Sequence, residues 1–307
     1  MVTIKEMAQE LGVSTTTVSN VIHGKTKEVS LANIERIQKI LKKYDYTPNI
    51  NARNLASKRS KIIGLLIKSK QNKIANRFED PFIGRILGAI ERHVRQKGYY
   101  LMVYAVDDVH QVQQFTMSWN MDGLITSGFV EGDIRYLKER FKNPIAIIDD
   151  YDTNGLGNCV NIRIEDEQAE YLLTKYVISC GHRKLAFLAD NLVNLDKIRF
   201  QGFCRALKEA NIPVSREENF IQIYASDAGE PQNMDEIYEK SFSYTALLCA
   251  SDYYAVHIEN MLLDRGRKIP EEISIAGFDD VPISRMVRPA LTTVRQDIQA
   301  KGIAAVE

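Results

Sequence analysis

The first sixty residues carry apolar side chains at the spacing expected of short amphipathic helices. In residues 4–11 apolar positions recur every three or four residues, and Gly12 follows them. Thr3 and Glu6 form a capping-box pattern ahead of this run, in which each side chain satisfies a backbone amide at the helix start. The pattern therefore predicts a first helix that begins after Thr3 and ends at Gly12.

Two further helices are predicted before residue 46. Ser14 can cap a helix over residues 15–22, whose apolar side chains face inward while its hydroxyl groups face outward. Ser30 can cap a third helix, whose apolar positions between 34 and 44 would close a small core. Ser, Thr and Asn at the start of the second helix suit contacts to phosphates and base edges, so we interpret residues 1–46 as a helix-turn-helix DNA-binding headpiece. The alternative is a generic helical bundle with a solvated hydroxyl face.

Residues 47–60 form a short connecting segment. Pro48 ends the third helix, because its ring excludes the helical conformation for the residue before it. The residues that follow have a helical composition but too little length for a stable isolated helix. The segment is therefore either a hinge helix that folds only when docked or an ordinary linker.

From Lys61 onward, short apolar runs alternate with amphipathic helices, among them one over residues 82–97. Strands are expected at 62–67, 99–105, 123–126, 144–148, 184–188, 220–224, 246–249 and 273–277. This alternation predicts parallel sheets, and its length indicates two lobes, at 61–160 and 161–290, with a crossover back to the first lobe in 291–307. The predicted fold class is α/β, with an all-α headpiece and a two-lobed core. Ligands of such sheets bind beyond the carboxyl ends of the strands, which places a binding site between the lobes.

The charge is unevenly distributed along the 307 residues. The chain holds 40 Lys and Arg and 40 Asp and Glu, but the first sixty residues carry ten basic against five acidic side chains. A basic N-terminal region followed by an acidic remainder indicates that only the N-terminal region binds a polyanionic partner.

No catalytic, cofactor or metal site is predicted. The four cysteines match no zinc spacing, and dinucleotide, Walker A, HExxH and GxSxG motifs are missing from the sequence. His182 follows a predicted helix, and we expect it to cap that helix. The N-terminus has no apolar core of signal-peptide length and no long apolar run occurs, so we expect a cytoplasmic protein that is not an enzyme.

The headpiece resembles that of the LacI/GalR (lactose/galactose repressor) family of transcription regulators. The resemblance rests on VTIKEMA at residues 2–8 and GVSTTTVSNVI at 12–22, and it is greatest to purine repressors. It implies base-edge contacts from Thr15, Thr16 and Asn20, and backbone contacts from Thr3, Ser14, Thr17, Ser19 and His23. Purine repressors carry histidine where this chain has Asn20, which leaves the operator sequence open.

The hinge resembles the same family. Residues 46–55 match the pattern Tyr-x-Pro-Asn-x-x-Ala-Arg-x-Leu. The resemblance implies a homodimer on a pseudo-palindromic operator, with paired hinge helices in the minor groove. Leu55 would wedge the central base step, and Ala52 would lie one helical turn before it.

The core resembles periplasmic sugar-binding proteins, and this implies an effector in the cleft. The residues expected to bind it are Phe82, Asp149, Arg199, Tyr224, Ser251 and Asp279. Taken singly, the charged ones fit helix caps or surface ion pairs better, Phe82 could merely anchor its helix, and Tyr224 could be an ordinary strand-end residue. The family usually continues beyond the position of Glu307, so we expect either a truncated C-terminus or a second lobe that lacks its last elements.

The identity of the effector stays open. A sugar or sugar phosphate is favoured, and a purine-like corepressor or a phosphocarrier protein partner are alternatives. The alternative from a different class of protein is a sugar receptor that does not bind DNA. Such a receptor would not need the basic headpiece.

Overall fold

The computed structural model describes residues 2–46, 59–68, 77–150, 157–224 and 231–307. These divide into two compact units, Met1–Ser60 and Lys61–Glu307. The first unit is all-helical and the second is α/β, as the sequence predicts.

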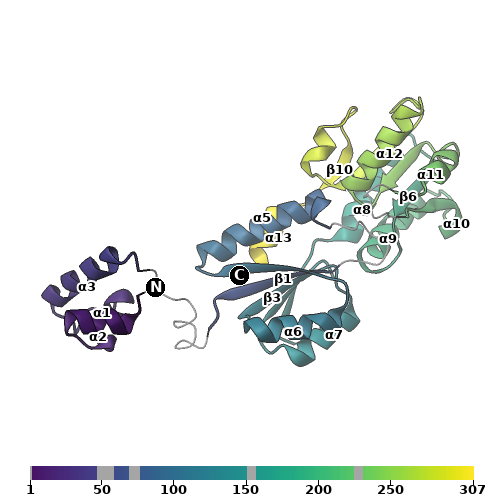
Figure 1. The fold of residues 1–307 in the computed structure, drawn as a ribbon. Helices are drawn as coiled ribbons and strands as arrows, with labels where there is room; N and C mark the ends of the chain where they lie inside the picture. Colours follow the sequence, from purple (N-terminus) through teal and green to yellow (C-terminus); the bar gives the residue numbers. More distant parts are fainter. Residues whose placement is uncertain (1, 47–58, 69–76, 151–156, 225–230) are drawn as a thin grey trace. The chain divides into compact units, whose positions relative to one another are not determined.

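The first unit is a three-helix headpiece made of α1 (Ile4–Leu11), α2 (Thr15–Ile22) and α3 (Leu31–Lys43) (Figure 1). The predicted capping box at Thr3 is present, and Gly12 ends α1 with a left-handed φ of 66°. A core that includes Ala8, Val18 and Ile37 holds the three helices together. The boundaries predicted for the first two helices are therefore confirmed.

The predicted end of the third helix is wrong, because α3 ends at Lys43, before Pro48, and the chain turns through Asp45 with a left-handed φ of 45°. Ser30 precedes α3 but makes no side-chain capping hydrogen bond.

The second unit begins with a lobe built on a parallel sheet with strand order β2-β1-β3-β4-β5. Its strands are β1 (Ile62–Lys68), β2 (Tyr100–Val106), β3 (Gly123–Ser127), β4 (Ile145–Ile148) and β5 (Cys159–Ile162). The short helix η1 (Arg77–Glu79) precedes α5 (Pro81–Gln96), which contributes to the core on one face of the sheet. The helices α6 (Val109–Trp119) and α7 (Glu131–Arg140) contribute to the core on the other face.

The second lobe repeats this plan with strand order β10-β9-β8-β6-β7, all parallel. Its strands are β6 (Leu185–Ala189), β7 (Phe220–Gln222), β8 (Ala246–Cys249), β9 (Ser274–Asp279) and β10 (Thr292–Arg295). Its helices are α8 (Asp166–Ser179), α9 (Asn194–Glu209), α10 (Arg216–Asn219), α11 (Met234–Ser241), α12 (Asp252–Asp264) and η2 (Pro282–Arg285). Helices cover both faces of this sheet, with α8 and α9 on one face and α11 and α12 on the other.

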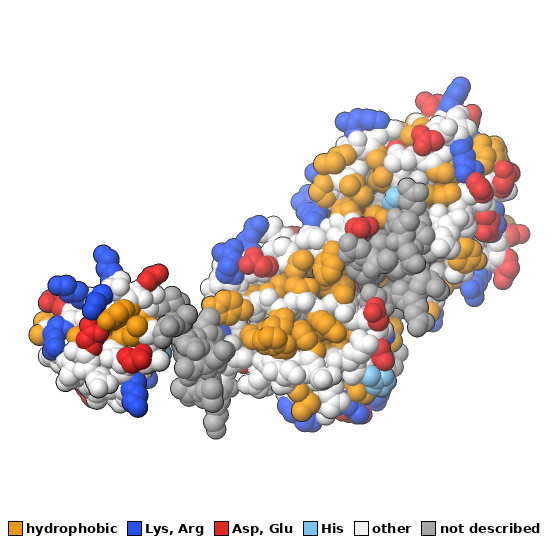
Figure 2. Space-filling view, viewed as in Figure 1, with side chains coloured by type: hydrophobic (Ala, Val, Ile, Leu, Met, Phe, Trp, Pro, Cys, Tyr) orange, Lys and Arg blue, Asp and Glu red, His pale blue; other side chains and the backbone are white. Residues whose placement is uncertain are grey.

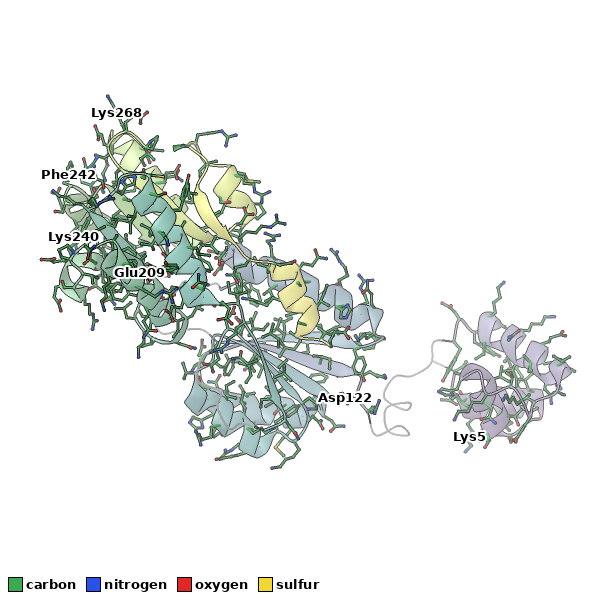
Figure 3. All side chains as sticks on the ribbon, turned by 180° about the vertical axis from the view of Figure 1, so that it is seen from behind. Lys5, Asp122, Glu209, Lys240, Phe242 and Lys268 are labelled. Atoms are coloured by element: carbon green, nitrogen blue, oxygen red, sulfur yellow. The ribbon has the colours of Figure 1, made fainter. Side chains whose placement is uncertain are left out.

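The crossover segment 291–307 is shared between the two lobes. Its first part is β10, which pairs with β9 in the second sheet, and only its helix α13 (Ile298–Ala304) packs against α5 of the first lobe. Figures 1 and 3 show α13 beside α5 from opposite sides. The approach is close, because a Cβ at Gly302 would lie 2.7 Å from Cβ of Ala89. The chain therefore crosses at residues 296–297, within the segment in which the sequence pattern places the crossover.

Two local predictions differ from the structure. β5 was not predicted, since its sequence Cys-Val-Asn-Ile lacks a continuous apolar run and its Val160 is exposed. The capping role expected of His182 is wrong: Arg183 donates to the carbonyl of Ile178 (3.0 Å), whereas Nδ1 of His182 lies 3.0 Å from Oγ1 of Thr245. In the described part of the chain, no helix has both the length and the apolar character needed to cross a membrane.

Candidate DNA-reading helix and effector cavity

The helix α2 presents its first turn to solvent. Ser14 caps it by accepting a hydrogen bond from the amide of Thr17 (3.0 Å), and the two hydroxyl oxygens lie 2.8 Å apart. Thr15 and Thr16 are exposed and Asn20 is half-buried. Thr15 and Thr16 are thus accessible at the start of the helix and Asn20 is partly accessible in its second half, while Ser14 and Thr17 fix the helix start.

The residues expected near the DNA backbone lie in α2 or at the ends of α1 and α2. Thr3 is exposed at the start of α1 and accepts from the amide of Glu6 (3.3 Å). At the end of α2, Nδ1 of His23 lies 2.7 Å from the carbonyl oxygen of Ser19. Figure 2 shows Lys and Arg side chains on the face of the headpiece in view. Ala52 and Leu55 of the hinge lie outside the described residues.

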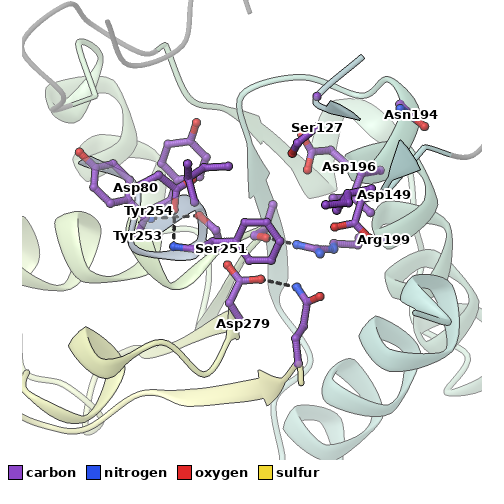
Figure 4. A pocket seen from close by; sticks show the side chains of 17 residues that line it. Asp80, Ser127, Asp149, Asn194, Asp196, Arg199, Ser251, Tyr253, Tyr254 and Asp279 are labelled. Carbon is purple, nitrogen blue, oxygen red and sulfur yellow. Dashed lines mark hydrogen bonds between the residues drawn. The ribbon is translucent and has the colours of Figure 1, made fainter. Parts of the chain in front are cut away.

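A cavity of about 120 Å³ lies between the two lobes of the core. It opens at the carboxyl ends of β3, β4, β8 and β9, where the fold rule for parallel sheets places a ligand. Polar and aromatic residues of the first lobe that line it are Asp80, Phe82, Ser127 and Asp149. Those of the second lobe are Asn194, Asp196, Arg199, Ser251, Tyr253, Tyr254 and Asp279, with Gln296 at the crossing (Figure 4).

Five of the six predicted effector residues therefore lie around one cavity. Tyr224 does not line it: its side chain is 46% exposed, and it follows β7, the outermost strand of the second sheet. Because β7 is separated from β8 by β6, its end lies away from the two strands that face the first lobe. Sequence could show that Tyr224 ends a strand but not that the strand is at the edge.

Hydrogen bonds and an ion pair within the second lobe fix the side chain of Arg199 in the cavity wall. Its Nε donates to Oδ1 of Asp166 (2.9 Å), its second terminal nitrogen lies 2.8 Å from the same oxygen, and its first donates to the carbonyl of Ala250. The guanidinium carbon also lies 3.6 Å from the ring centre of Phe278. Burial by itself would lower the pKa of Arg199, but the neighbouring carboxylates, Asp166 foremost, raise the pKa overall.

A hydrogen-bonded chain joins the two lobes across the cavity. Nζ of Lys301 on α13 donates to both carboxylate oxygens of Asp149 (2.7 and 2.9 Å) and to Oε1 of Gln296 (2.6 Å). Nε2 of Gln296 donates in turn to Oδ1 of Asp279 (2.5 Å). Burial raises the pKa of Asp149 despite the opposing attraction of Lys301, and burial likewise raises the pKa of Asp279 well above its usual value.

Sequence reasoning missed Lys301, Gln296 and Asp166. A signal for Lys301 existed, since it falls on the apolar side of a short helix, three residues after the buried Ile298. A lysine there needs a buried partner, which the pattern alone does not name. Asp166 could not be distinguished in the sequence from an ordinary acidic residue at the start of a helix.

Ser251 and Phe82 combine a structural role with a place on the cavity wall. Ser251 caps α12 by accepting from the amide of Tyr254 (3.3 Å). Phe82 is the second residue of α5, where its amide donates to Asp80 (2.9 Å), and its ring packs on the apolar core of the first lobe. Both sequence-based interpretations of Phe82 are thus compatible with its position, and Ser251, predicted only as an effector residue, also caps a helix.

A helix-turn-helix unit and a two-lobed core with an interlobe cavity, joined in one chain, define a DNA-binding transcription regulator that responds to a small molecule. Comparison with known proteins agrees. Residues 3–49 match the bacterial regulatory proteins of the lacI family, and residues 174–307 match a periplasmic binding protein-like domain.

Relatives match along the whole chain. It is 30% identical to the ribose operon repressor of Haemophilus influenzae and 29% identical to the HTH-type transcriptional repressor PurR of Pasteurella multocida, covering 90% of each. The chain belongs to the lacI family of bacterial regulatory proteins.

Solved structures show the same fold. The lac repressor dimer bound to operator and the anti-inducer ONPF superimposes with a TM-score of 0.85 at 24% identity, over 99% of this chain and 90% of that one. A LacI family regulator from Enterococcus faecium with bound ribose gives a TM-score of 0.67 at 22% identity, over 80% of this chain and 88% of that one. The predicted family and fold class are confirmed.

Proposed function

We propose that the protein is a cytoplasmic repressor that binds a pseudo-palindromic operator as a homodimer and is controlled by a sugar or sugar phosphate bound between its lobes. The observation that carries this proposal is the interlobe cavity in a chain whose headpiece exposes a polar helix start. The names of its relatives, which are repressors rather than enzymes, support it.

In this proposal α2 lies in the major groove. The exposed Thr15 and Thr16 contact base edges together with Asn20, whose amide matches the donor and acceptor pair of adenine. Thr3, Ser14, Thr17, Ser19 and His23 lie where backbone phosphates would pass. The hinge residues Ala52 and Leu55 enter the minor groove, as the sequence resemblance implies.

Control follows from the lobes sharing one cavity. Asp149 comes from the first lobe and Arg199 and Asp279 from the second, so a ligand that contacts all three stabilises one relative orientation of the lobes. Within the described residues the chain passes between the lobes twice, at 163–165 and 296–297. A change in orientation would alter the spacing of the two hinges in a dimer and hence their fit to DNA.

The DNA-reading role can be tested by substituting Thr16 and Asn20 by alanine together. A duplex that wild-type protein selects from a random pool serves as the operator, and binding is measured by fluorescence anisotropy against an unselected duplex. We expect the variant to lose its preference while retaining salt-dependent, non-specific binding. Gln38→Ala, at an exposed position of α3, is the matched control. Preserved selectivity in the double variant would remove α2 from the base-reading role.

The effector role can be tested by a thermal-shift screen followed by operator binding. A sugar that raises the unfolding temperature and changes operator affinity supports the proposal. A purine with both effects would instead support the second candidate, which the similarity to PurR proteins favours. If only a phosphocarrier protein changed operator affinity, the cavity would not be the control site.

A further inference from the structure

A turn of the second lobe packs into the first lobe. Residues 279–283, which we call the interlobe turn, run from the end of β9 into η2. Val281 in this turn is 1% exposed and belongs to the apolar core of the first lobe, together with Ile83 of α5. Arg85 of α5 also donates to the carbonyl of Asp280 (3.1 Å). The interlobe turn therefore joins the two lobes through apolar packing and a hydrogen bond.

The same turn carries a residue of the cavity wall. Asp279, its first residue, lines the cavity and accepts a hydrogen bond from Nε2 of Gln296 (Figure 4). Asp279 and Asp280 both have left-handed φ values, 119° and 51°. Residues other than glycine adopt such values at a cost in energy, so these conformations persist only where neighbouring groups hold them. The position of Val281 in the first lobe thus depends on the groups that fix the turn.

Asp252, the first residue of α12, is one of these groups. It is fully buried, and its two carboxylate oxygens accept from the amide of Val281 (2.9 Å) and from the hydroxyl of Thr293 on β10 (2.5 Å). The hydroxyl of Thr293 accepts in turn from the amide of Asp280 (3.4 Å). Gly277 on β9 leaves room for this arrangement, because a Cβ there would lie 2.3 Å from Oδ1 of Asp252. Asp252 is not among the described residues that line the cavity, so its influence on a ligand is indirect.

We infer that Asp252 is a positioning residue that couples the cavity to the contact between the lobes. It holds the interlobe turn so that Asp279 lines the cavity while Val281 packs in the first lobe. A ligand that binds Asp279 would displace or secure the turn, and Val281 would pass this change to α5. This inference rests on the proposed function of the cavity as an effector site, and it names the route by which that site controls the orientation of the lobes.

Hydrogen exchange of the full chain, followed by mass spectrometry, tests this route at a distance from the substituted residues. Asp252→Asn keeps the shape of the side chain but replaces one acceptor oxygen by an amide group, and Val281→Ala removes packing in the first lobe. Each should make the amides in the first half of α5 exchange about tenfold faster or more. Because both variants act on one contact, the double variant should add little further. If Asp252→Asn fails to fold, Thr293→Val takes its place, since it removes only the hydroxyl group that joins Asp252 to Asp280.

Asn219→Ala is the matched control. Asn219 is also a buried side chain of the second lobe with two hydrogen bonds, to the carbonyl of Leu185 (2.9 Å) and from the amide of Ser215 (3.0 Å). It contacts the start of β6, which β8 separates from β9, so the control should loosen the second lobe without changing exchange in α5. An equal acceleration in α5 by Asn219→Ala, or an effect of Asp252→Asn confined to α12 and β10, would overturn the inference.

The end of the turn at the cavity is tested by Asp279→Ala. This variant removes the acceptor of the hydrogen bond from Gln296 and leaves Asp252 and Val281 in place. It should also accelerate exchange in the first half of α5. Unchanged exchange there would mean that the cavity and the interlobe turn are not coupled, which contradicts the inference.

Operator binding by the same variants tests the proposed function separately. With the duplex that wild-type protein selects, Asp252→Asn and Val281→Ala should shift the dissociation constant by about fivefold or more in the same direction. If exchange in α5 responds as expected but operator affinity does not, the coupling of the lobes through the turn is supported, and control of DNA binding by lobe orientation is contradicted. If exchange in α5 does not respond, the inference is contradicted and the proposed function is not.

Discussion

Glu170 on α8 carries a buried carboxyl group, and its surroundings disfavour the ionised form. Its side chain is fully buried, and Oε1 accepts one hydrogen bond from Thr174 (3.3 Å). Within the described residues, Oε2 has no hydrogen-bond partner. Burial raises the pKa of Glu170 from 4.5 to about 8, although the attraction of Arg199 opposes this. The native state therefore favours the protonated acid at neutral pH.

The sign of the pH effect follows from proton linkage. Because the folded protein holds this proton more tightly than the unfolded chain, stability is highest below the ordinary glutamate pKa of 4.5 and falls as pH rises toward about 8. Each pH unit between the two values costs about 1.4 kcal/mol, so the full penalty is about 5 kcal/mol above pH 8. Glu170→Gln preserves the shape of the protonated acid and removes the penalty.

Urea unfolding followed by circular dichroism tests this expectation. The stability advantage of Glu170→Gln over wild type should grow by about 3 kcal/mol between about pH 5.5 and about pH 8.5, as the linkage relation requires. Glu239→Gln on the exposed side of α11 is the control and should show no such growth. An advantage of Glu170→Gln that is constant with pH would refute the reasoning, because it would mean that Glu170 is ionised throughout.

Two further variants probe packing and capping. Gly202→Ala should lower the free energy of unfolding by about 1 to 3 kcal/mol, because its Cβ would lie 2.1 Å from the carbonyl oxygen of Glu167 where α9 meets α8. Thermal unfolding should separate it from Gly84→Ala, which meets no atom within 4 Å, and equal midpoints would contradict the clash. Ser14→Ala should destabilise the start of α2 by about 1 kcal/mol, which hydrogen exchange of the α2 amides would report as about fivefold faster exchange. Ser30→Ala should change α3 less, because Ser30 makes no side-chain capping bond, and an equal effect in both helices would count against the capping account.

The sequence predicted those features that depend on nearby residues. The headpiece helices follow from caps and apolar spacing within a few positions, and the buried strands β1, β6 and β8 follow from continuous apolar runs. Strand-end positions also placed Asp149 and Asp279 correctly beside one cavity. Local pattern was sufficient because parallel strands bring their carboxyl ends to one edge.

The features that escaped prediction depend on distant pairs. Lys301 meets Asp149 across 152 positions of sequence, and Arg199 meets Asp166 across 33. Neither pairing has a periodicity that a single sequence could reveal. The position of Tyr224 depended on the order of strands in the sheet, which alternation of strands and helices does not fix.

The placement of cavity residues just after buried strands has a consequence for how such regulators diversify. Asp149 and Asp279 sit where β4 and β9 end, with left-handed φ values of 59° and 119° that turn the backbone out of the sheet. Asn is tolerated in the left-handed region nearly as well as Asp, so the charge at such a position can change without rebuilding the strand behind it. New ligand preferences can therefore evolve by a few exchanges at the ends of the strands while the packing of both sheets is kept.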